Sequence, residues 1–326
     1  IQRGLEYQRL ARRQYELRRR LDEHYGLASL IGNSRHMVRV YNAVRQAAPL
    51  DSPVLILGES GTGKDLVAQA IHNNSPRRDE AFVKFSCTVS AERVEADLFG
   101  YASGHTQAEG RRGLVEAADK GTLFLDQLGA LSPELHPALI DVLEQGRTQR
   151  IGGVRAVPVN VRFIAANDRP LTDETSQALS SRFGVTTIEI PPLRERQEDI
   201  PLLAQHFLRE GGSRATGFTA RALDLLMRYP WPGNVRELKN TITGMATIAN
   251  DDRPFDLPDI PAYIRHYAEP AAGEIRVAVG TSMADVERTV IEETMKACGY
   301  RKEACAKTLK IGLRTLYRKL REYGLQ

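Results

Sequence analysis

The chain has 326 residues, of which 42% are hydrophobic and 26% charged, so it is a globular protein with room for two or three domains, neither collagen-like nor wholly disordered. No apolar run approaches the roughly 18–20 residues that a membrane span needs, and the charged N-terminus lacks a signal-peptide core. Its three cysteines have no paired spacing, which predicts a reducing, cytoplasmic location with neither disulfides nor a cysteine-bound metal.

The formal net charge of +4 is unevenly distributed along the chain. Between Lys296 and Glu322 there are nine Lys and Arg but only two Glu, so the remainder of the chain is mildly acidic. A basic module on an acidic body is typical of a nucleic-acid-binding tail.

Residues 1–24 are predicted to form one charged helix. Leu10, Leu17 and Leu21 have heptad-compatible spacing, but three leucines suit a solvated linker helix as well as a dimerisation helix. The sequence begins without Met, and we expect this helix to join the core to a missing upstream domain.

From residue 27 to 197, short β-rich runs alternate with helical patterns. The predicted strands are residues 53–57, 82–86, 122–126, 160–166 and 186–190. Several are apolar nearly throughout, which is typical of parallel strands covered on both faces. Strands separated by helices predict a doubly wound α/β domain with a parallel sheet.

The second half of the chain reads as helical. Residues 198–265 have helical patterning with a break at Pro230 and Pro232, and residues 266–281 have the composition of a linker. Residues 282–326 are predicted to hold three helices. Ser282 caps the first, and a tight turn at 310–312 separates the second (302–309) from the third (313–323), which predicts a helix-turn-helix.

A glycine-rich loop between a predicted strand and a predicted helix carries the strongest chemical signal. Its residues are Gly58, Glu59, Ser60, Gly61, Thr62, Gly63, Lys64 and Asp65. The glycines let backbone N–H groups turn toward phosphate oxygens, the helix N-terminus adds partial positive charge, and the lysine reaches the β- and γ-phosphates. Asp65 stands where a Ser or Thr usually binds Mg²⁺, so the loop predicts ATP binding without a complete Mg²⁺ site.

A predicted strand with an acidic residue near its carboxyl end, at residues 121–127, matches the other half of a nucleotide-binding site. Asp126 at its carboxyl end is placed to hold Mg²⁺ through water. The next position normally carries a Glu that polarises the attacking water, and here it is Gln127. A neutral amide cannot accept a proton, so the pattern predicts ATP binding but not ATP hydrolysis.

These loops, together with DLFG (97–100), IPPLRER (190–196), WPGNVREL (231–238) and TLYRKL (315–320), resemble the motifs of AAA+ bacterial enhancer-binding proteins that activate sigma-54 RNA polymerase. The resemblance covers about residues 29–326. It implies an AAA+ core (27–197) with a helical lid (198–265), a Fis-like DNA-binding domain (282–326) and an upstream receiver-type domain of a two-component system. It also implies that Arg236 senses nucleotide from the lid and that Leu30 and Ile31 border the adenine.

The sequence departs from the family pattern at three places. The GAFTGA loop that grips sigma-54 reads GHTQAE at residues 104–109. Of the two arginines that the family places across the subunit interface, one survives as Arg182 and the other falls on Ser176. The sensor strand, which ends Ala-Thr-Asn-Arg in the family, here ends with Asn167, Asp168 and Arg169 after Ala166. The loss of one arginine that acts across the subunit interface can by itself lower the rate of phosphoryl transfer by about 10³-fold or more. These changes therefore predict an AAA+ domain that no longer works as an ATP-hydrolysing motor.

This pattern favours a regulator that acts without sigma-54, in the manner of the VpsR- and FleQ-like members of the family. Some of these bind cyclic di-GMP through an arginine before the core, but Ala28 occupies that position here, so a site for this effector would lie elsewhere. Two alternatives stay open: an active ATP-hydrolysing sigma-54 activator that remodels RNA polymerase, and a scaffold whose ligand controls only oligomeric state.

The last predicted helix has the residues of a recognition helix. Contacts to bases and phosphates are predicted for Arg314, Thr315, Arg318 and Lys319. Leu316, Leu320 and Tyr317 are expected to pack inward. One such module reads a short half-site, so we expect a homodimer or higher homo-oligomer on promoter DNA, with RNA polymerase as a further partner and no membrane contact.

Overall fold

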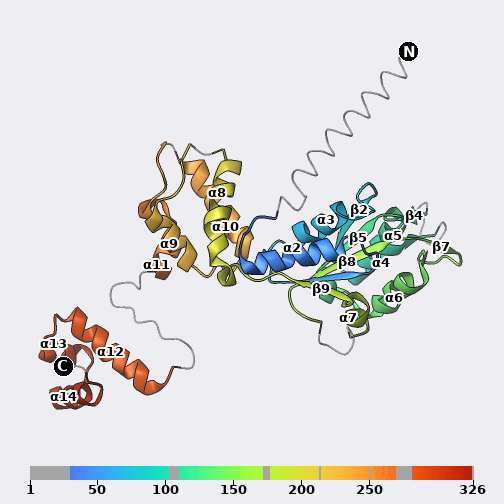
Figure 1. The fold of residues 1–326 in the computed structure, drawn as a ribbon. Helices are drawn as coiled ribbons and strands as arrows, with labels where there is room; N and C mark the ends of the chain where they lie inside the picture. Colours follow the sequence, from blue (N-terminus) through green and yellow to red (C-terminus); the bar gives the residue numbers. More distant parts are fainter. Residues whose placement is uncertain are drawn as a thin grey trace. The chain divides into compact units, whose positions relative to one another are not determined.

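A computed structural model describes residues 30–102, 110–171, 177–212, 214–249, 252–268 and 281–324. The chain divides into two compact units, Ile1–Phe255 and Asp256–Gln326 (Figure 1). The predicted helix at 1–24, Ala28, the loop at 104–109 and Ser176 lie outside the described residues.

Among the described residues, five strands form one parallel sheet in the order β2-β5-β8-β1-β9. Their bounds are Val54–Leu57 (β1), Phe82–Ser86 (β2), Thr122–Asp126 (β5), Arg162–Asn167 (β8) and Thr186–Glu189 (β9). Each begins and ends within two residues of a predicted strand. The α/β fold class with a parallel sheet is therefore confirmed.

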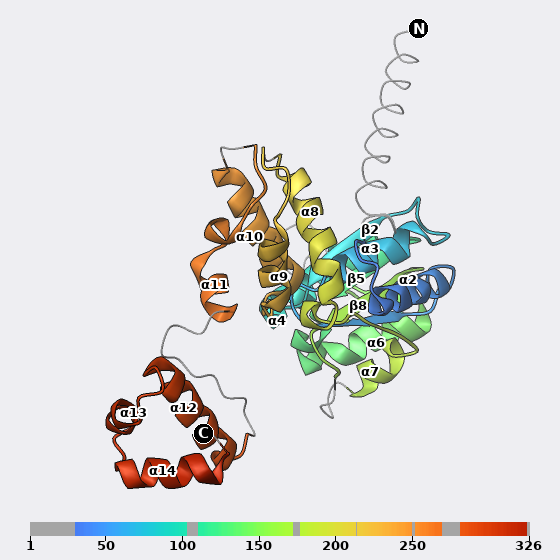
Figure 2. The same ribbon diagram turned by 60° about the vertical axis from the view of Figure 1, so that its left-hand side comes forward.

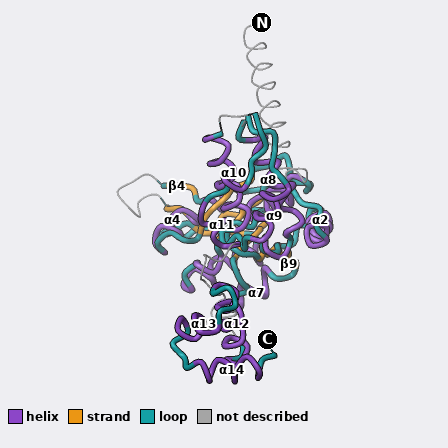
Figure 3. Tube along the Cα trace, turned by 90° about the vertical axis from the view of Figure 1, so that its left-hand side faces the viewer, coloured by secondary structure: helices purple, strands orange, loops and turns teal. Residues whose placement is uncertain are grey.

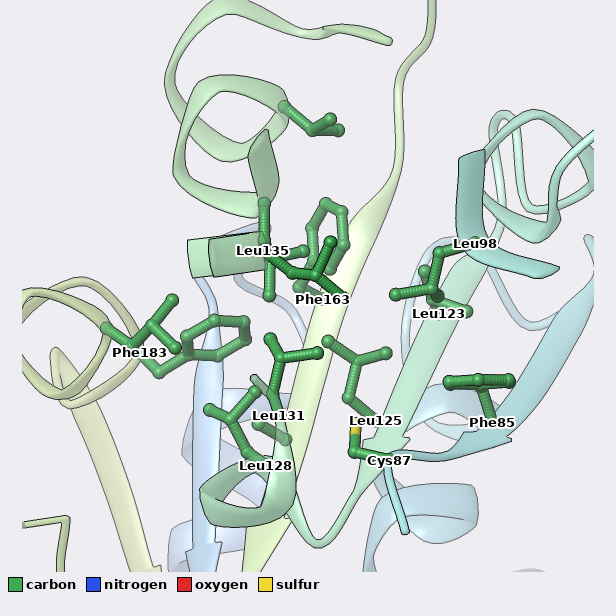
Figure 4. Close-up of a cluster of buried hydrophobic side chains, with 14 of the residues drawn as sticks. Phe85, Cys87, Leu98, Leu123, Leu125, Leu128, Leu131, Leu135, Phe163 and Phe183 are labelled. Carbon is green, nitrogen blue, oxygen red and sulfur yellow. The ribbon is translucent and has the colours of Figure 1, made fainter. Parts of the chain in front are cut away.

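Helices cover both faces of this sheet, as its apolar strands require. On one face, Val54 and Ile56 pack with residues of α2 (Arg35–Ala47) and α3 (Lys64–Asn73). On the other, Leu55 and Leu57 share a core with residues of α4 (Ala91–Phe99), α6 (His136–Gln145) and α7 (Gln177–Phe183). Figure 4 shows this second core, in which Leu123 and Leu125 of strand β5 lie among leucine and phenylalanine side chains.

Several short elements have no counterpart in the sequence prediction. Two antiparallel pairs join β3 (Gly100–Tyr101) to β4 (Arg111–Arg112) and β6 (Arg147–Gln149) to β7 (Ala156–Pro158). The remaining short helices are α5 (Leu114–Ala117) and the 3₁₀ turns Leu128–Ala130, Pro133–Leu135, Leu193–Glu195, Gln197–Asp199 and Leu257–Asp259. Strands of two or three residues are too short to produce an alternating pattern.

The lid consists of α8 (Ile200–Glu210), α9 (Ala220–Arg228) and α10 (Asn234–Ile248), with α8 packed against the other two (Figure 2). The predicted break before α10 is present. Trp231 lies within it with no exposed surface and donates its indole N–H to the carbonyl of Leu226 at 2.8 Å. This buried ring fixes the turn that leads into α10.

The second unit is helical throughout its described part, with α11 (Ala262–Ala268), α12 (Met283–Ala297), α13 (Lys302–Thr308) and α14 (Leu313–Glu322) (Figure 3). Ser282 caps α12 as predicted, and its hydroxyl accepts from the N–H of Asp285 at 3.2 Å. A small core holds the last three helices together, formed by Ile291, Met295, Cys305, Ala306, Leu316 and Leu320. No helix in the described ranges is long and apolar enough to cross a membrane.

Candidate nucleotide site and DNA-binding helix

The glycine-rich loop leads from β1 into α3 with its backbone turned for an anion. Gly61 (φ +79°) and Gly63 (φ +102°) adopt left-handed conformations that favour glycine, and a Cβ added to Gly63 would meet open space. The N–H groups of Lys64 and Asp65 lie in the first turn of α3, where no helix carbonyl can accept from them. The loop therefore fits a phosphate group at a helix N-terminus.

Lys64 is held firmly in this loop. Its side chain is 7% exposed, and its ammonium group donates to the carbonyl oxygens of Gly58 at 2.7 Å and Glu59 at 3.1 Å. A third bond, 2.7 Å long, reaches the Oδ1 carboxylate oxygen of Asp168, which directly follows β8. The lysine thus has a carboxylate partner within the protein.

The carboxyl ends of the neighbouring strands bring further acidic groups to this edge of the sheet. Burial raises the pKa of Asp126, and the nearby carboxylate of Asp65 raises it further. Asp65 itself is paired with Lys84. Within the described ranges, no three His, Cys, Asp or Glu side chains form a group that could hold a metal ion alone, so Mg²⁺ would need phosphate and water oxygens besides the oxygen of Asp126.

Gln127 follows Asp126 at the end of β5 and adopts a left-handed conformation (φ +58°). Its side chain offers an amide at the position after the acidic residue, as the sequence indicated. Of the two interface positions, Ser176 is not among the described residues, while Arg182 lies in the last turn of α7 and is ion-paired with Glu144 on α6.

The lid and the 3₁₀ turn Leu193–Glu195 before it both contact the phosphate loop. Arg194 donates both terminal nitrogens to the carboxylate of Glu59 at 2.7 and 2.6 Å, and this pairing lowers the pKa of Glu59 to about 2. The buried amide of Asn234 bonds to Glu59 at 3.1 Å and to the carbonyl of Ser60 at 3.0 Å. Sequence reasoning missed both partners, although each stands inside a motif that carried the family resemblance.

Arg236, predicted to sense nucleotide, lies beside the loop. Its guanidinium donates to the hydroxyl of Ser60 at 3.2 Å, and its backbone N–H donates to the carbonyl of Gly61 at 3.2 Å. Thr62, the remaining residue of the loop, closes the turn by donating its hydroxyl to the carbonyl of Glu59 at 2.8 Å. Hydrogen bonds therefore connect the lid to the phosphate loop.

The segment predicted to border adenine is anchored by residues that the sequence analysis did not identify. Leu30 is 9% exposed and Ile31 is half-buried. The hydroxyl of Tyr41 donates to the carbonyl of Leu30 at 2.7 Å, and the buried carboxylate of Asp199 accepts from the N–H of Ser34 at 2.9 Å. Asp199 lies 165 residues from Ser34 along the chain, so only the fold reveals the contact.

Helix α14 presents part of the predicted recognition surface. Arg314 and Arg318 are exposed, Thr315 is half-buried, and Leu316 and Leu320 face the core as expected. The expectation that Tyr317 packs inward is wrong, because the residue is 51% exposed and the ammonium group of Lys302 lies 5.2 Å from its ring centre.

Lys319 is engaged inside the domain. Its side chain is 18% exposed and its ammonium group bonds to the carboxylate of Glu287 on α12 at 2.8 Å. It also lies 3.3 Å from the hydroxyl of Tyr323. These bonds tie α14 to α12 and engage the ammonium group of Lys319, whose contact with DNA stays a prediction.

Comparisons with known proteins agree with this arrangement. Residues 30–183 match the sigma-54 interaction domain, residues 194–275 the AAA+ ATPase lid domain, and residues 282–323 the Fis family of bacterial regulatory proteins. The chain is 40% identical over 309 residues to the transcriptional regulatory protein ZraR of Salmonella typhimurium, covering 89% of this chain and 68% of ZraR. The chain belongs to the bacterial enhancer-binding protein family.

Two further relatives extend this assignment. The Nif-specific regulatory protein of Herbaspirillum seropedicae is 41% identical over 259 residues, which cover 76% of this chain and 48% of that protein. The crystal structure of NtrX from Brucella abortus in complex with ATP has a TM-score of 0.71 and 26% identity, covering 99% of this chain and 75% of NtrX. The predicted AAA+ core, helical lid and Fis-type helix-turn-helix are thereby confirmed, and enhancer-binding proteins are DNA-binding transcription regulators.

Proposed function

We propose that this enhancer-binding protein is a DNA-binding transcription regulator whose AAA+ core binds ATP, hydrolyses it slowly or not at all, and acts without sigma-54. The observation that carries the proposal is the contrast within one site. The phosphate loop has the geometry of an anion cradle, whereas the strand ends that would activate water carry Gln127 and a carboxylate bonded to Lys64.

The chemistry of the strand ends supports slow hydrolysis. Attack on the terminal phosphate needs an oriented water and cations that neutralise developing charge. The Gln127 amide can accept a hydrogen bond but cannot take a proton, and Arg182 is already paired with Glu144. Asp126 would hold Mg²⁺ at this edge, which supports nucleotide binding without supplying a base.

The second candidate is an active sigma-54 activator, and the match of residues 30–183 to the sigma-54 interaction domain favours it. Purified sigma-54 mixed with this protein and a non-hydrolysable ATP analogue separates the two, with light scattering reporting the mass of any complex. We expect no complex, because the loop at 104–109 lacks the Phe-Thr pair. The matched variant, with Thr106→Phe and Gln107→Thr, introduces this Phe-Thr pair into the loop. Complex formation by the natural sequence would support the second candidate instead.

The proposed DNA contacts are Arg314, Thr315 and Arg318. We predict that Arg314→Ala and Arg318→Ala each weaken binding to a DNA duplex and lower the slope of log K against log salt by about 1. Fluorescence anisotropy at several salt concentrations measures both quantities. Arg288→Ala, an exposed arginine on α12, serves as the control for loss of one charge. Salt slopes unchanged in both α14 variants would contradict the assigned helix.

Control by cyclic di-GMP and assembly into a homodimer or larger oligomer are separate proposals. A calorimetric titration that shows no heat with the dinucleotide, across the concentrations at which the protein dimerises, would end the first. A ligand that changes the mass of the assembly without changing DNA affinity would favour the scaffold alternative. RNA polymerase is the partner that we propose for the assembled regulator.

A further inference from the structure

We infer that Asp168 makes this site prefer a nucleoside diphosphate to a nucleoside triphosphate. The inference rests on the proposed nucleotide site and concerns which phosphate chain that site accepts. It depends on where the carboxylate of Asp168 lies relative to Lys64.

All three hydrogen-bond donors of the Lys64 ammonium group are used within the protein. An ammonium group has three donors, and those of Lys64 are used by two loop carbonyls and by Asp168 at 2.7 Å. A lysine in such a loop normally reaches the β- and γ-phosphates. The carboxylate of Asp168 therefore occupies the place beside Lys64 where an oxygen of the terminal phosphate would bind.

The strand ends around this phosphate position carry negative charge. Asp126 ends β5, which pairs in parallel with β8, and its register partner Ala166 is two residues before Asp168. Both carboxylates therefore lie at the same edge of the sheet. A γ-phosphate placed against the strand ends adds negative charge close to these carboxylates, and like charges at such short range repel.

The diphosphate and the triphosphate differ in how close they come to these carboxylates. The loop amides and the N-terminus of α3 can hold a β-phosphate without approaching the strand ends. A diphosphate therefore meets the favourable part of the site, while a triphosphate must also place its last phosphate beside Asp168. The carboxylate of Asp168 is 44% exposed, so a bound phosphate can reach it.

Asp168→Asn tests the inference, because it removes the charge and keeps the shape. Dissociation constants for ADP and ATP, each with Mg²⁺, are measured by calorimetry for the full chain and for this variant. We expect the substitution to raise ATP affinity relative to ADP affinity by about tenfold or more, which corresponds to about 1.4 kcal/mol. Asp168→Ala is a second variant with the same expected direction.

The control is Asp51→Asn, which removes the carboxylate paired with Arg77 on the same unit and is expected to leave the ratio unchanged. If both nucleotides bind and neither Asp168 variant changes the ratio of their affinities, the inference is overturned while the nucleotide site stands. If neither nucleotide binds the natural chain or the variants, the nucleotide site itself is overturned, and the inference falls with it.

Discussion

Replacing Lys64 by Ala is expected to weaken ADP and ATP binding by about 100-fold. Hydrogen bonds from a charged group contribute about 1.5–3 kcal/mol each, and the lysine is the cation that the loop directs at the phosphates. The substitution also leaves the carboxylate of Asp168 without its partner at 2.7 Å, so an unneutralised charge would face the ligand. Calorimetric titration with each nucleotide measures the loss.

The double variant Lys64→Ala with Asp168→Asn separates these two causes. It is expected to bind nucleotide more tightly than Lys64→Ala alone, since the unpaired carboxylate is gone. Binding by Lys64→Ala within about threefold of the natural chain would show that nucleotide does not use this loop.

Replacing Trp231 by Ala is expected to lower the free energy of unfolding of the first unit by about 3–5 kcal/mol, the usual cost of deleting a large buried side chain. The indole has no exposed surface, donates to the carbonyl of Leu226 at 2.8 Å, and packs edge-on against Tyr229 with ring centres 5.0 Å apart. Urea unfolding followed by far-UV circular dichroism gives the change.

Trp231→Phe is the matched control, because it keeps most of the buried area and loses only the indole hydrogen bond and part of the ring, so its decrease in the free energy of unfolding should be clearly smaller. The alanine variant should also weaken nucleotide binding. A Cβ added to Gly61 would lie 2.3 Å from the carbonyl oxygen of Gly233, so the turn fixed by the tryptophan presses against the phosphate loop. A loss below about 1 kcal/mol in the alanine variant would contradict this account of the lid.

The sheet and the phosphate loop were predictable because their signals are local. Strand β1 is four consecutive apolar residues that are all buried, and it is followed at once by glycines and Lys64. The bond between Lys64 and Asp168 was not predictable in the same way, since it joins residues 104 apart. The same holds for Glu59 and Arg194, which lie 135 residues apart.

The recognition helix shows a different limit. Leu316, Tyr317 and Leu320 have the spacing of one apolar helix face, and all three are expected to pack inward. Of the residues of α14, only Leu316 and Leu320 belong to the buried core of the domain, whereas Leu313 and Tyr317 are 38% and 51% exposed. Periodicity identifies the inward face of a helix, but the partner helices decide how wide that face is.

The most direct test of the central claim is steady-state ATP turnover at high protein concentration with DNA, measured beside Lys64→Ala and Gln127→Glu. We predict that the natural chain turns over ATP at the background rate of Lys64→Ala, because Gln127 cannot act as a base and Asp168 lies beside the phosphate position. Turnover clearly above that of Lys64→Ala would show that the site hydrolyses ATP and would make the sigma-54-remodelling enzyme the leading function.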